Sequence, residues 1–310
     1  MLYVKPVSAD IEAELQTAFT TGLPWAAETE PHLGGALRQT LDHPGSLVRA
    51  RLVYEMAHAY GLANSRAKNL AVAIEYFHTA SLLFDDLPCM DDAAERRGQP
   101  CVHHTHGEAA AILAALGLVS RAYALLWQAL TESSADRQTL AGSYVEKCLG
   151  VNGLLSGQSE DLHYVSLPEY RRSPQKVATG KTVSLIRLSL VLPALLAGVE
   201  PGEVRLLERL AVFWGLGYQI LDDFKDVYQQ AAACTGKTSA RDQSLNRPNL
   251  VLAVGADQSL QRLERLMGLG DQILNRLMAR LPSLGYLNEL RGRFRQEISR
   301  IKAINFSPAL

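Results

Sequence analysis

Apolar residues recur along this chain with the period of an α-helix, and this pattern constrains the fold more than any other feature. Alternating β-branched stretches are rare, and there is no Asn-Gly or Asp-Gly hairpin signal. The breaks, at Pro31–Gly35 and Gly98–Pro100 among others, do not have the composition of flexible linkers. The sequence therefore predicts one all-α domain over residues 1–310, a bundle of about ten helices. The predicted helices are Val4–Thr21, Ser46–Leu62, Ala67–Phe84, Gly107–Leu130, Ser134–Ser156, Ser173–Ala197, Glu203–Gln230, Leu260–Ala279 and Leu287–Ile301.

The composition is that of a globular protein. Apolar residues make up 47% of the chain, enough for a core, and the net charge of −1 gives no general attraction to nucleic acid or to an anionic membrane. The most apolar stretch, Leu185–Val199, is too short to span a bilayer, and the N-terminus lacks the apolar core of a signal peptide. The cysteines form no CxxC pair, so reduced thiols are predicted. We expect a cytoplasmic protein without stable membrane insertion. The cysteines are Cys89, Cys101, Cys148 and Cys234.

Two aspartate clusters carry the first indication of function. They are DDLPCMDD at Asp85–Asp92 and DDFKD at Asp222–Asp226, and each follows an apolar, helix-period run. Crowded carboxylates repel one another and need cations, and hard oxygen ligands suit Mg²⁺, which usually keeps water and substrate phosphate as its other ligands. The clusters predict a Mg²⁺-dependent enzyme acting on a phosphate ester, with both clusters facing one cavity.

Helix geometry places the second cluster on one face. Asp222 and Asp226 are four positions apart, and Gln219 precedes Asp222 by three, so all three share a side of the helix. Acidic pairs at this spacing destabilise a bare helix. A bound divalent cation explains why they are tolerated.

In the first cluster, a proline interrupts the helical spacing. Pro88 can distort the helix and bring Asp91 back towards Asp85. His78 lies two turns before Asp85 on the same face. Directly after the cluster come Arg96 and Arg97, whose guanidinium groups either pair with the carboxylates or bind phosphate.

The motifs in order resemble those of the trans-isoprenyl diphosphate synthases. The first cluster is followed by RRGxP, then by GQxxD (Gly157, Gln158, Asp161), KT (Lys181-Thr182), YQxxDDxxD and GKTxxxD (Gly236 to Asp242). The similarity runs from about residue 40 to 255, and the stretch ASLLFDDLPCMDDAAERRGQP is similar to bacterial geranylgeranyl diphosphate synthases. The order and completeness of these motifs make the resemblance specific.

The resemblance implies an isoprenoid-synthase bundle with a central cavity, several Mg²⁺ ions and a homodimer. It implies a prenyltransferase that ionises an allylic diphosphate and joins it to isopentenyl diphosphate. The implied metal ligands are Asp85, Asp86, Asp91, Asp222, Asp223 and Asp226. The implied allylic diphosphate ligands are Arg96, Lys181 and Lys237, with Thr182 and Gln219 near the reacting carbon; Lys181, Thr182 and Gln219 are thus the candidate catalytic residues. The implied isopentenyl diphosphate ligands are Arg49, His78 and Arg97.

One motif departs from the family. Where the family carries GGKRxRP, this chain has PGSLVRA, in which Ser46 replaces the lysine and Leu47 the next arginine. A lost hydrogen bond to a charged group, at roughly 1.5–3 kcal/mol, would weaken isopentenyl diphosphate binding about ten- to a hundred-fold. A terpene cyclase, or a prenyltransferase with another acceptor, is therefore the alternative, and a non-catalytic partner subunit is a second one.

The residues before Asp85 bear on product length. Ser81 lies one turn before Asp85, about 6 Å along the helix, and Ala80 precedes it; both are small. In the family that the chain resembles, an aromatic side chain near these positions favours shorter products. We expect a pocket for a geranylgeranyl chain, with farnesyl as the shorter possibility, although small residues here also suit close helix packing.

Overall fold

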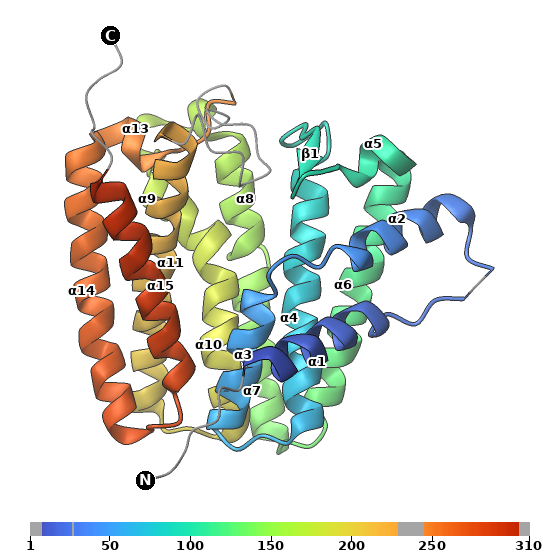
Figure 1. The fold of residues 1–310 in the computed structure, drawn as a ribbon, viewed down its shortest axis with the longest axis horizontal. Coiled ribbons are helices and arrows are strands. Elements are labelled where there is room, and N and C mark those ends of the chain that lie inside the picture. The colour runs from blue at the N-terminus through green and yellow to red at the C-terminus, as the bar shows by residue number, and fades with distance from the viewer. Residues whose placement is uncertain (1–7, 27, 229–244, 304–310) are drawn as a thin grey trace. The chain divides into compact units, whose positions relative to one another are not determined.

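The computed structural model describes residues 8–26, 28–228 and 245–303, which form two compact units. The first unit contains the described residues up to Gln138, and the second contains those from Thr139 onward. Both are built from helices, as the sequence predicted (Figure 1). That the two units make up one domain with a central cavity stays a prediction.

In the first unit, α4 is the central helix. It packs against α3 on one side and α6 on another, and its buried residues include Leu70, Ile74 and Tyr76. A short antiparallel hairpin of β1 and β2 lies between α4 and α5, with Arg96 paired to Gln99. The elements are α1 (Ser8–Thr21), α2 (Pro31–Asp42), α3 (Val48–Ala59), α4 (Asn64–Asp85), β1 (Glu95–Arg96), β2 (Gln99–Pro100), α5 (Val102–His106) and α6 (Glu108–Leu130).

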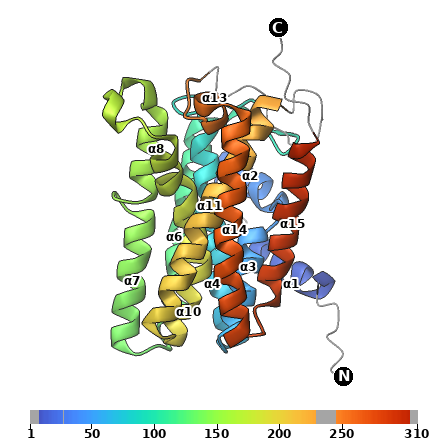
Figure 2. The same cartoon turned by 90° about the vertical axis from the view of Figure 1, so that its left-hand side faces the viewer.

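In the second unit, α11 is the central helix. It packs against α10 and α14, and α14 runs beside it in Figure 2. Trp214 is the largest of its fully buried side chains. Helix α7 begins in the first unit and continues into the second. The elements from here on are α7 (Ala135–Leu149), α8 (Leu154–Leu162), η1 (Tyr164–Ser166), η2 (Glu169–Arg171), α9 (Pro174–Ala178), η3 (Thr179–Val183), α10 (Ser184–Ala197), α11 (Pro201–Tyr228), α13 (Leu250–Val254), α14 (Ala256–Arg280) and α15 (Gly285–Lys302).

The predicted break at Pro31–Gly35 was wrong, because α2 occupies this stretch. Pro31 is its first residue, where the missing N–H would have had no helical partner. The side chain of Glu30 caps the helix by accepting a hydrogen bond from the Leu33 amide at 3.0 Å. A proline in a first turn therefore looks, in the sequence, like a break.

The predicted helix Ser134–Ser156 is also interrupted, since α7 ends at Leu149 and α8 begins at Leu154. A short turn joins the two helices, and at Gly153 within it a Cβ would lie 2.2 Å from the carbonyl oxygen of Cys148. Only glycine permits this approach. The turn brings α8 into position against the helices that follow it.

Two helical stretches among the described residues, Glu108–Leu130 and Pro174–Ala197, are long and apolar enough to cross a membrane by length and composition. The second is 67% buried within the protein, as expected of a core helix, and the first is 44% buried. The described cysteines form no disulfide: Cys89 is exposed, whereas Cys101 and Cys148 are buried. Cys234 lies outside the described residues.

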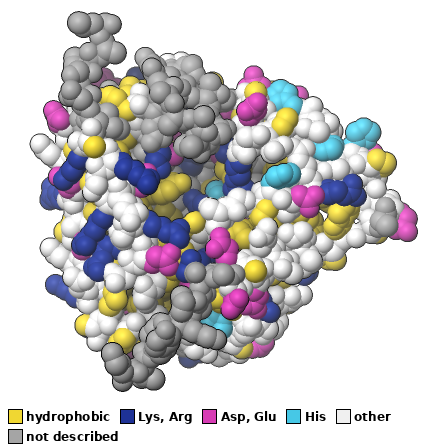
Figure 3. Space-filling view, viewed as in Figure 1, with side chains coloured by type: hydrophobic (Ala, Val, Ile, Leu, Met, Phe, Trp, Pro, Cys, Tyr) yellow, Lys and Arg dark blue, Asp and Glu magenta, His cyan; other side chains and the backbone are white. Residues whose placement is uncertain are grey.

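Lys and Arg side chains spread over α14 and α15 of the second unit, in dark blue at the left of Figure 3. Several of them pair with acidic neighbours. Arg295 lies 2.6 Å from Asp271, and Arg293 lies 2.7 Å from Glu289. Exposed pairs of this kind contribute little stability, and we assign them no site.

Candidate active site

The first aspartate cluster begins where α4 ends. Beyond Asp85 the chain turns back, so that the amide of Asp91 donates to the Asp85 carbonyl oxygen at 2.9 Å. Pro88 is exposed within this loop, where its lack of an N–H is harmless. The backbone thus makes the return of Asp91 that the sequence predicted, and both aspartates are partly exposed.

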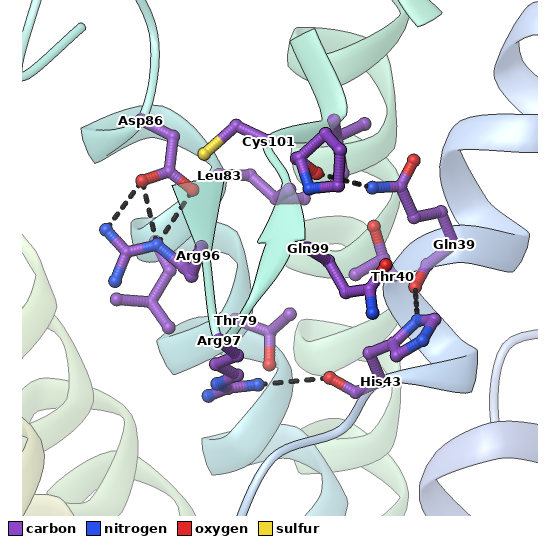
Figure 4. A pocket seen from close by; sticks show the side chains of 13 residues that line it. Gln39, Thr40, His43, Thr79, Leu83, Asp86, Arg96, Arg97, Gln99 and Cys101 are labelled. Carbon is purple, nitrogen blue, oxygen red and sulfur yellow. Dashed lines mark hydrogen bonds and ion pairs between the residues drawn. The ribbon is translucent and has the colours of Figure 1, made fainter. Parts of the chain in front are cut away.

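Asp86 is buried, whereas Asp85 and Asp91 are partly exposed. Its side chain accepts from Arg96 with both oxygens: Nε lies 2.7 and 2.8 Å away, and Nη2 lies 2.6 Å from Oδ1 (Figure 4). Burial lowers the pKa of Arg96, but the bonds to Asp86 outweigh it and leave that pKa raised. This is a bidentate, charge-assisted contact. The predicted metal ligand and the predicted diphosphate ligand therefore neutralise each other in this structure.

Arg97 occupies the turn of the β1–β2 hairpin. Arg97 and Gly98 both have positive φ, of 56° and 73°, which is the conformation of a two-residue type I′ turn. The guanidinium of Arg97 reaches α2, where Nη1 donates to the His43 carbonyl oxygen at 3.1 Å. Gly45 has a positive φ of 73°, which favours glycine, and a Cβ there would lie 2.3 Å from Arg97 Cζ and displace the end of that side chain.

Arg49 and His78, the other predicted isopentenyl diphosphate ligands, are in contact. Arg49 Nη1 lies 3.0 Å from His78 Nε2. The two substituted residues of the PGSLVRA motif differ in exposure. Ser46 is exposed, whereas Leu47 is buried at the start of α3 and has a left-handed φ of 45°. An arginine at position 47 would have to leave this buried place to reach a ligand.

A pocket opens in the first unit between α2, α4 and the hairpin (Figure 4). Gln39 ties α2 to β2 by donating to the Pro100 carbonyl oxygen at 2.8 Å. The wall also includes Thr79, whose buried hydroxyl has no hydrogen-bond partner among the described residues. The pocket thus borders the hairpin that carries Arg96 and Arg97.

The predicted chain-length residues lie on α4. Ala80 is 1% exposed, so it is part of the packed interior of the first unit. Ser81 is partly exposed, and its hydroxyl donates to the His78 carbonyl oxygen at 2.8 Å. Their role in a product pocket stays a prediction.

In the second unit, a π-turn carries Lys181 and Thr182. It spans Thr179–Val183 between α9 and α10, and such turns recur at functional sites. The turn packs directly on α8. A Cβ on Gly157 would lie 2.2 Å from the Lys181 amide nitrogen, and one on Gly180 would lie 2.7 Å from Gly157 Cα. Glycines at both positions let the two backbones touch.

A chain of hydrogen bonds leads from this turn through α11 to α13. Thr182 donates to Gln219 Oε1 at 2.6 Å, and Gln219 Nε2 donates to Asp223 Oδ1 at 2.9 Å. Asp223 is 2% exposed, and its Oδ2 accepts from the amide of Leu250 at 2.7 Å. The second aspartate of this pair therefore holds the start of α13.

Lys181 itself is held by Asp161, the last residue of the GQxxD motif. The Lys181 Nζ to Asp161 Oδ2 distance is 2.7 Å, and Arg247 Nη1 donates to the Asp161 carbonyl oxygen at 3.4 Å. Asp161 is buried. The GQxxD motif indicated Asp161 but not its partner. Asp161 and Lys181 come together only because α8 packs on the π-turn.

The remaining predicted ligands of the second cluster differ in exposure. Asp222 is exposed and Asp226 is partly exposed. Lys237 lies outside the described residues. Within the parts of the chain that the structure describes, no three carboxylate, histidine or cysteine side chains are grouped closely enough to hold a metal by themselves.

The family model of the polyprenyl synthetases matches residues 30–275. The chain belongs to the polyprenyl synthetase family. It is 34% identical over 244 residues to a geranylgeranyl diphosphate synthase of Pseudescherichia vulneris, covering 77% of this chain and 76% of that one. It is 33% identical over 236 residues to a farnesyl diphosphate synthase of Escherichia coli K12, covering 75% and 78%.

A solved polyprenyl synthetase-like structure has the same fold. A geranyltransferase from Helicobacter pylori, crystallised with magnesium and isoprenyl diphosphate, matches with a TM-score of 0.80 at 25% identity, over 93% of this chain and 96% of that one. The predicted fold class and enzyme class are confirmed. This polyprenyl synthetase is a prenyltransferase that joins an allylic diphosphate to isopentenyl diphosphate. The comparisons give no support to the cyclase or to the non-catalytic subunit.

Proposed function

We propose that this enzyme makes geranylgeranyl diphosphate. Overall identity does not decide the product, because geranylgeranyl and farnesyl diphosphate synthases match about equally well. The observation that supports the longer product is the small size of Ala80 and Ser81, one turn before Asp85 on α4. A tail growing past this turn would meet a methyl group and a hydroxymethyl group instead of an aromatic ring.

We propose that Asp85 and Asp91 of the first unit, with Asp222 and Asp226 of the second, hold more than one Mg²⁺. Asp222 is exposed and the other three are partly exposed, whereas Asp86 and Asp223 are buried. Bound Mg²⁺ would supply Lewis-acid stabilisation of the diphosphate leaving group. On this view Asp86 and Asp223 orient the cluster rather than ligate directly. That the two clusters face each other is part of the proposal.

The remaining site residues act on charge and orientation. In the reaction the allylic C–O bond breaks, the double bond of isopentenyl diphosphate attacks the resulting cation, and a proton passes to the departing diphosphate. Cations stabilise the leaving group electrostatically, and we assign this role to Arg96, Lys181 and Lys237. Thr182 and Gln219 would face the reacting carbon. Arg49, His78 and Arg97 would hold the second diphosphate.

The chain-length assignment predicts that Ala80→Tyr shortens the product from twenty carbons to fifteen. The enzyme is incubated with Mg²⁺, geranyl diphosphate and radiolabelled isopentenyl diphosphate, and the products are dephosphorylated and separated by chain length. Because Ala80 is buried, Ser81→Phe provides a second test at a partly exposed position. Ser81→Ala, which adds no bulk, is the control and should retain the long product. An unchanged product from folded Ala80→Tyr and Ser81→Phe would contradict the assignment.

We further propose that a second copy of the chain covers α6. From Leu113 onward its exposed apolar side chains are spaced by three, seven and four residues, so they lie on one side of the helix and form one stripe. An interface between identical copies pairs the same patch on both. Trp127 and Leu116 are 64% and 51% exposed, unusual for such large apolar residues. The stripe consists of Ile112, Leu113, Leu116, Tyr123 and Trp127.

Leu116→Glu is expected to convert a dimer into a monomer, because it puts a charge at the centre of the stripe. Light scattering after size-exclusion chromatography gives the mass directly. Val165→Glu, exposed to a similar degree at 54% but outside α6, should leave the mass unchanged. A monomeric wild type, or flotation of the wild type with lipid vesicles that Leu116→Glu abolishes, would show that the stripe has another use.

A further inference from the structure

The helix that carries Arg49 begins without a cap of its own. The residue at the N-cap position of α3 is Leu47, whose side chain cannot accept a hydrogen bond. The first-turn amides of a helix need outside acceptors. Here the amide of Ala50 donates to Glu75 Oε2 at 2.9 Å. Glu75 belongs to α4, so a side chain from a different helix does what an N-cap side chain ordinarily does.

Two neighbouring residues of α3 are held by one face of α4. Glu75 and His78 are three positions apart and therefore lie side by side on that helix. Glu75 binds the backbone of Ala50, while His78 Nε2 lies 3.0 Å from Nη1 of Arg49. Because a guanidinium can only donate, Nε2 must accept, which assigns the histidine proton to Nδ1. The position of Arg49 is thus fixed through both its side chain and its backbone.

Glu75 is buried among the cations assigned to isopentenyl diphosphate. Its exposure is 2%. Burial raises the pKa of Glu75 above its ordinary value, although Arg49, the hydrogen bond from Ala50 and Arg97 oppose this shift. Arg49 Nε is buried and has no hydrogen-bond partner among the described residues.

A negative charge at this place opposes the binding of a diphosphate, so its benefit must come from geometry. We propose that Glu75 is a positioning residue of the isopentenyl diphosphate site: by reaching the Ala50 amide it sets the first turn of α3 and thereby the place of Arg49. This rests on the proposed function of Arg49. With Ser46 and Leu47 in place of two cations, Arg49 is the basic residue left in PGSLVRA, and its placement gains weight.

Two substitutions of Glu75 separate the effect of its side-chain length from that of its charge. Glu75→Asp keeps the charge but shortens the side chain by one C–C bond, about 1.5 Å, so the bond to Ala50 is lost. Glu75→Gln keeps the reach and the acceptor oxygen but not the charge. We expect Glu75→Asp to raise the KM for isopentenyl diphosphate about tenfold. Glu75→Gln should rescue it to within about threefold of the wild type. The KM for the allylic diphosphate should change less than twofold in both.

Glu55→Asp is the matched control, since Glu55 lies on α3 and its ion pair is with Arg51, 3.6 Å away, which is not one of the proposed ligands. If Glu75→Asp does not fold, isosteric Glu75→Gln alone decides. A tenfold rise in Glu75→Gln would overturn the proposal in favour of a charge effect. Equal changes in both KM values would show a general structural role instead. Failure of the proposed function is distinguishable, because the wild type would then give no product dependent on isopentenyl diphosphate.

Discussion

Asp222→Ala is expected to abolish turnover while leaving the fold at least as stable as before. Asp222 is exposed, and its loss removes the repulsion from Asp226 four residues on, worth about 0.2–0.5 kcal/mol. Alanine is also the better helix former. If Asp222 holds Mg²⁺ at the leaving group, kcat should fall at least about 10³-fold, the scale of a lost electrostatic contact of several kcal/mol.

Asp223→Ala, one residue further along α11, should act mainly on stability. It leaves the buried amide of Leu250 and the side chain of Gln219 without their acceptor. Each lost bond to a charged group is worth roughly 1.5–3 kcal/mol, so a loss of about 3 kcal/mol or more is expected. Thermal unfolding without Mg²⁺ separates the two adjacent variants. If Asp222→Ala unfolds earlier than Asp223→Ala, the division of roles proposed for the pair is wrong.

Gly157→Ala is expected to destabilise the protein by at least about 3 kcal/mol, beyond the usual range for overpacking. The new Cβ would lie 2.2 Å from the Lys181 nitrogen and 2.5 Å from the Gly180 carbonyl carbon. Both are backbone atoms, so no side-chain rotation relieves the clash. With an unfolding entropy of about 2.1 cal/mol/K per residue, the melting temperature should fall by about 5 °C. Displacement of Lys181 and Thr182 should also lower kcat about 10²-fold.

Gly142→Ala provides the matched control for this substitution. Gly142 lies within α7, and a Cβ there would meet nothing within 4 Å. The same change should therefore stabilise the protein by about 0.5–1 kcal/mol, because it lowers the entropy of the unfolded chain. If Gly157→Ala had the same melting temperature as Gly142→Ala, α8 and the π-turn would be less tightly packed than the structure indicates.

The helices could be predicted because their apolar period is local to the sequence, whereas two elements of the first unit could not. Helix α2 has its proline in the first turn, where it resembles a break. The β1–β2 hairpin turns at Arg97-Gly98 instead of Asn-Gly, so its signal was weak.

The motifs predicted most of the candidate site residues. They did not predict which of these residues bind ligands and which make internal contacts. Whether Asp222 or Asp223 points inward depends on where α13 packs, more than twenty residues away in the sequence. Glu75 was overlooked for the same reason. In the sequence it is one charged residue within an apolar helix run, and only the packing of α3 on α4 reveals its partner.

The π-turn at Thr179–Val183 has a consequence for how the stretch Pro174–Ala197 behaves as a unit. A π-turn holds one residue more than an α-turn, which rotates everything beyond it by about 100° relative to an unbroken helix. The apolar faces of α9 and α10 are consequently out of phase with each other. Hydropathy averaged over the stretch treats it as one continuous helix. The apolar sides of its two halves, before and after the π-turn, nevertheless point in different directions. The offset allows α10 to fill the core while Lys181 turns towards Asp161.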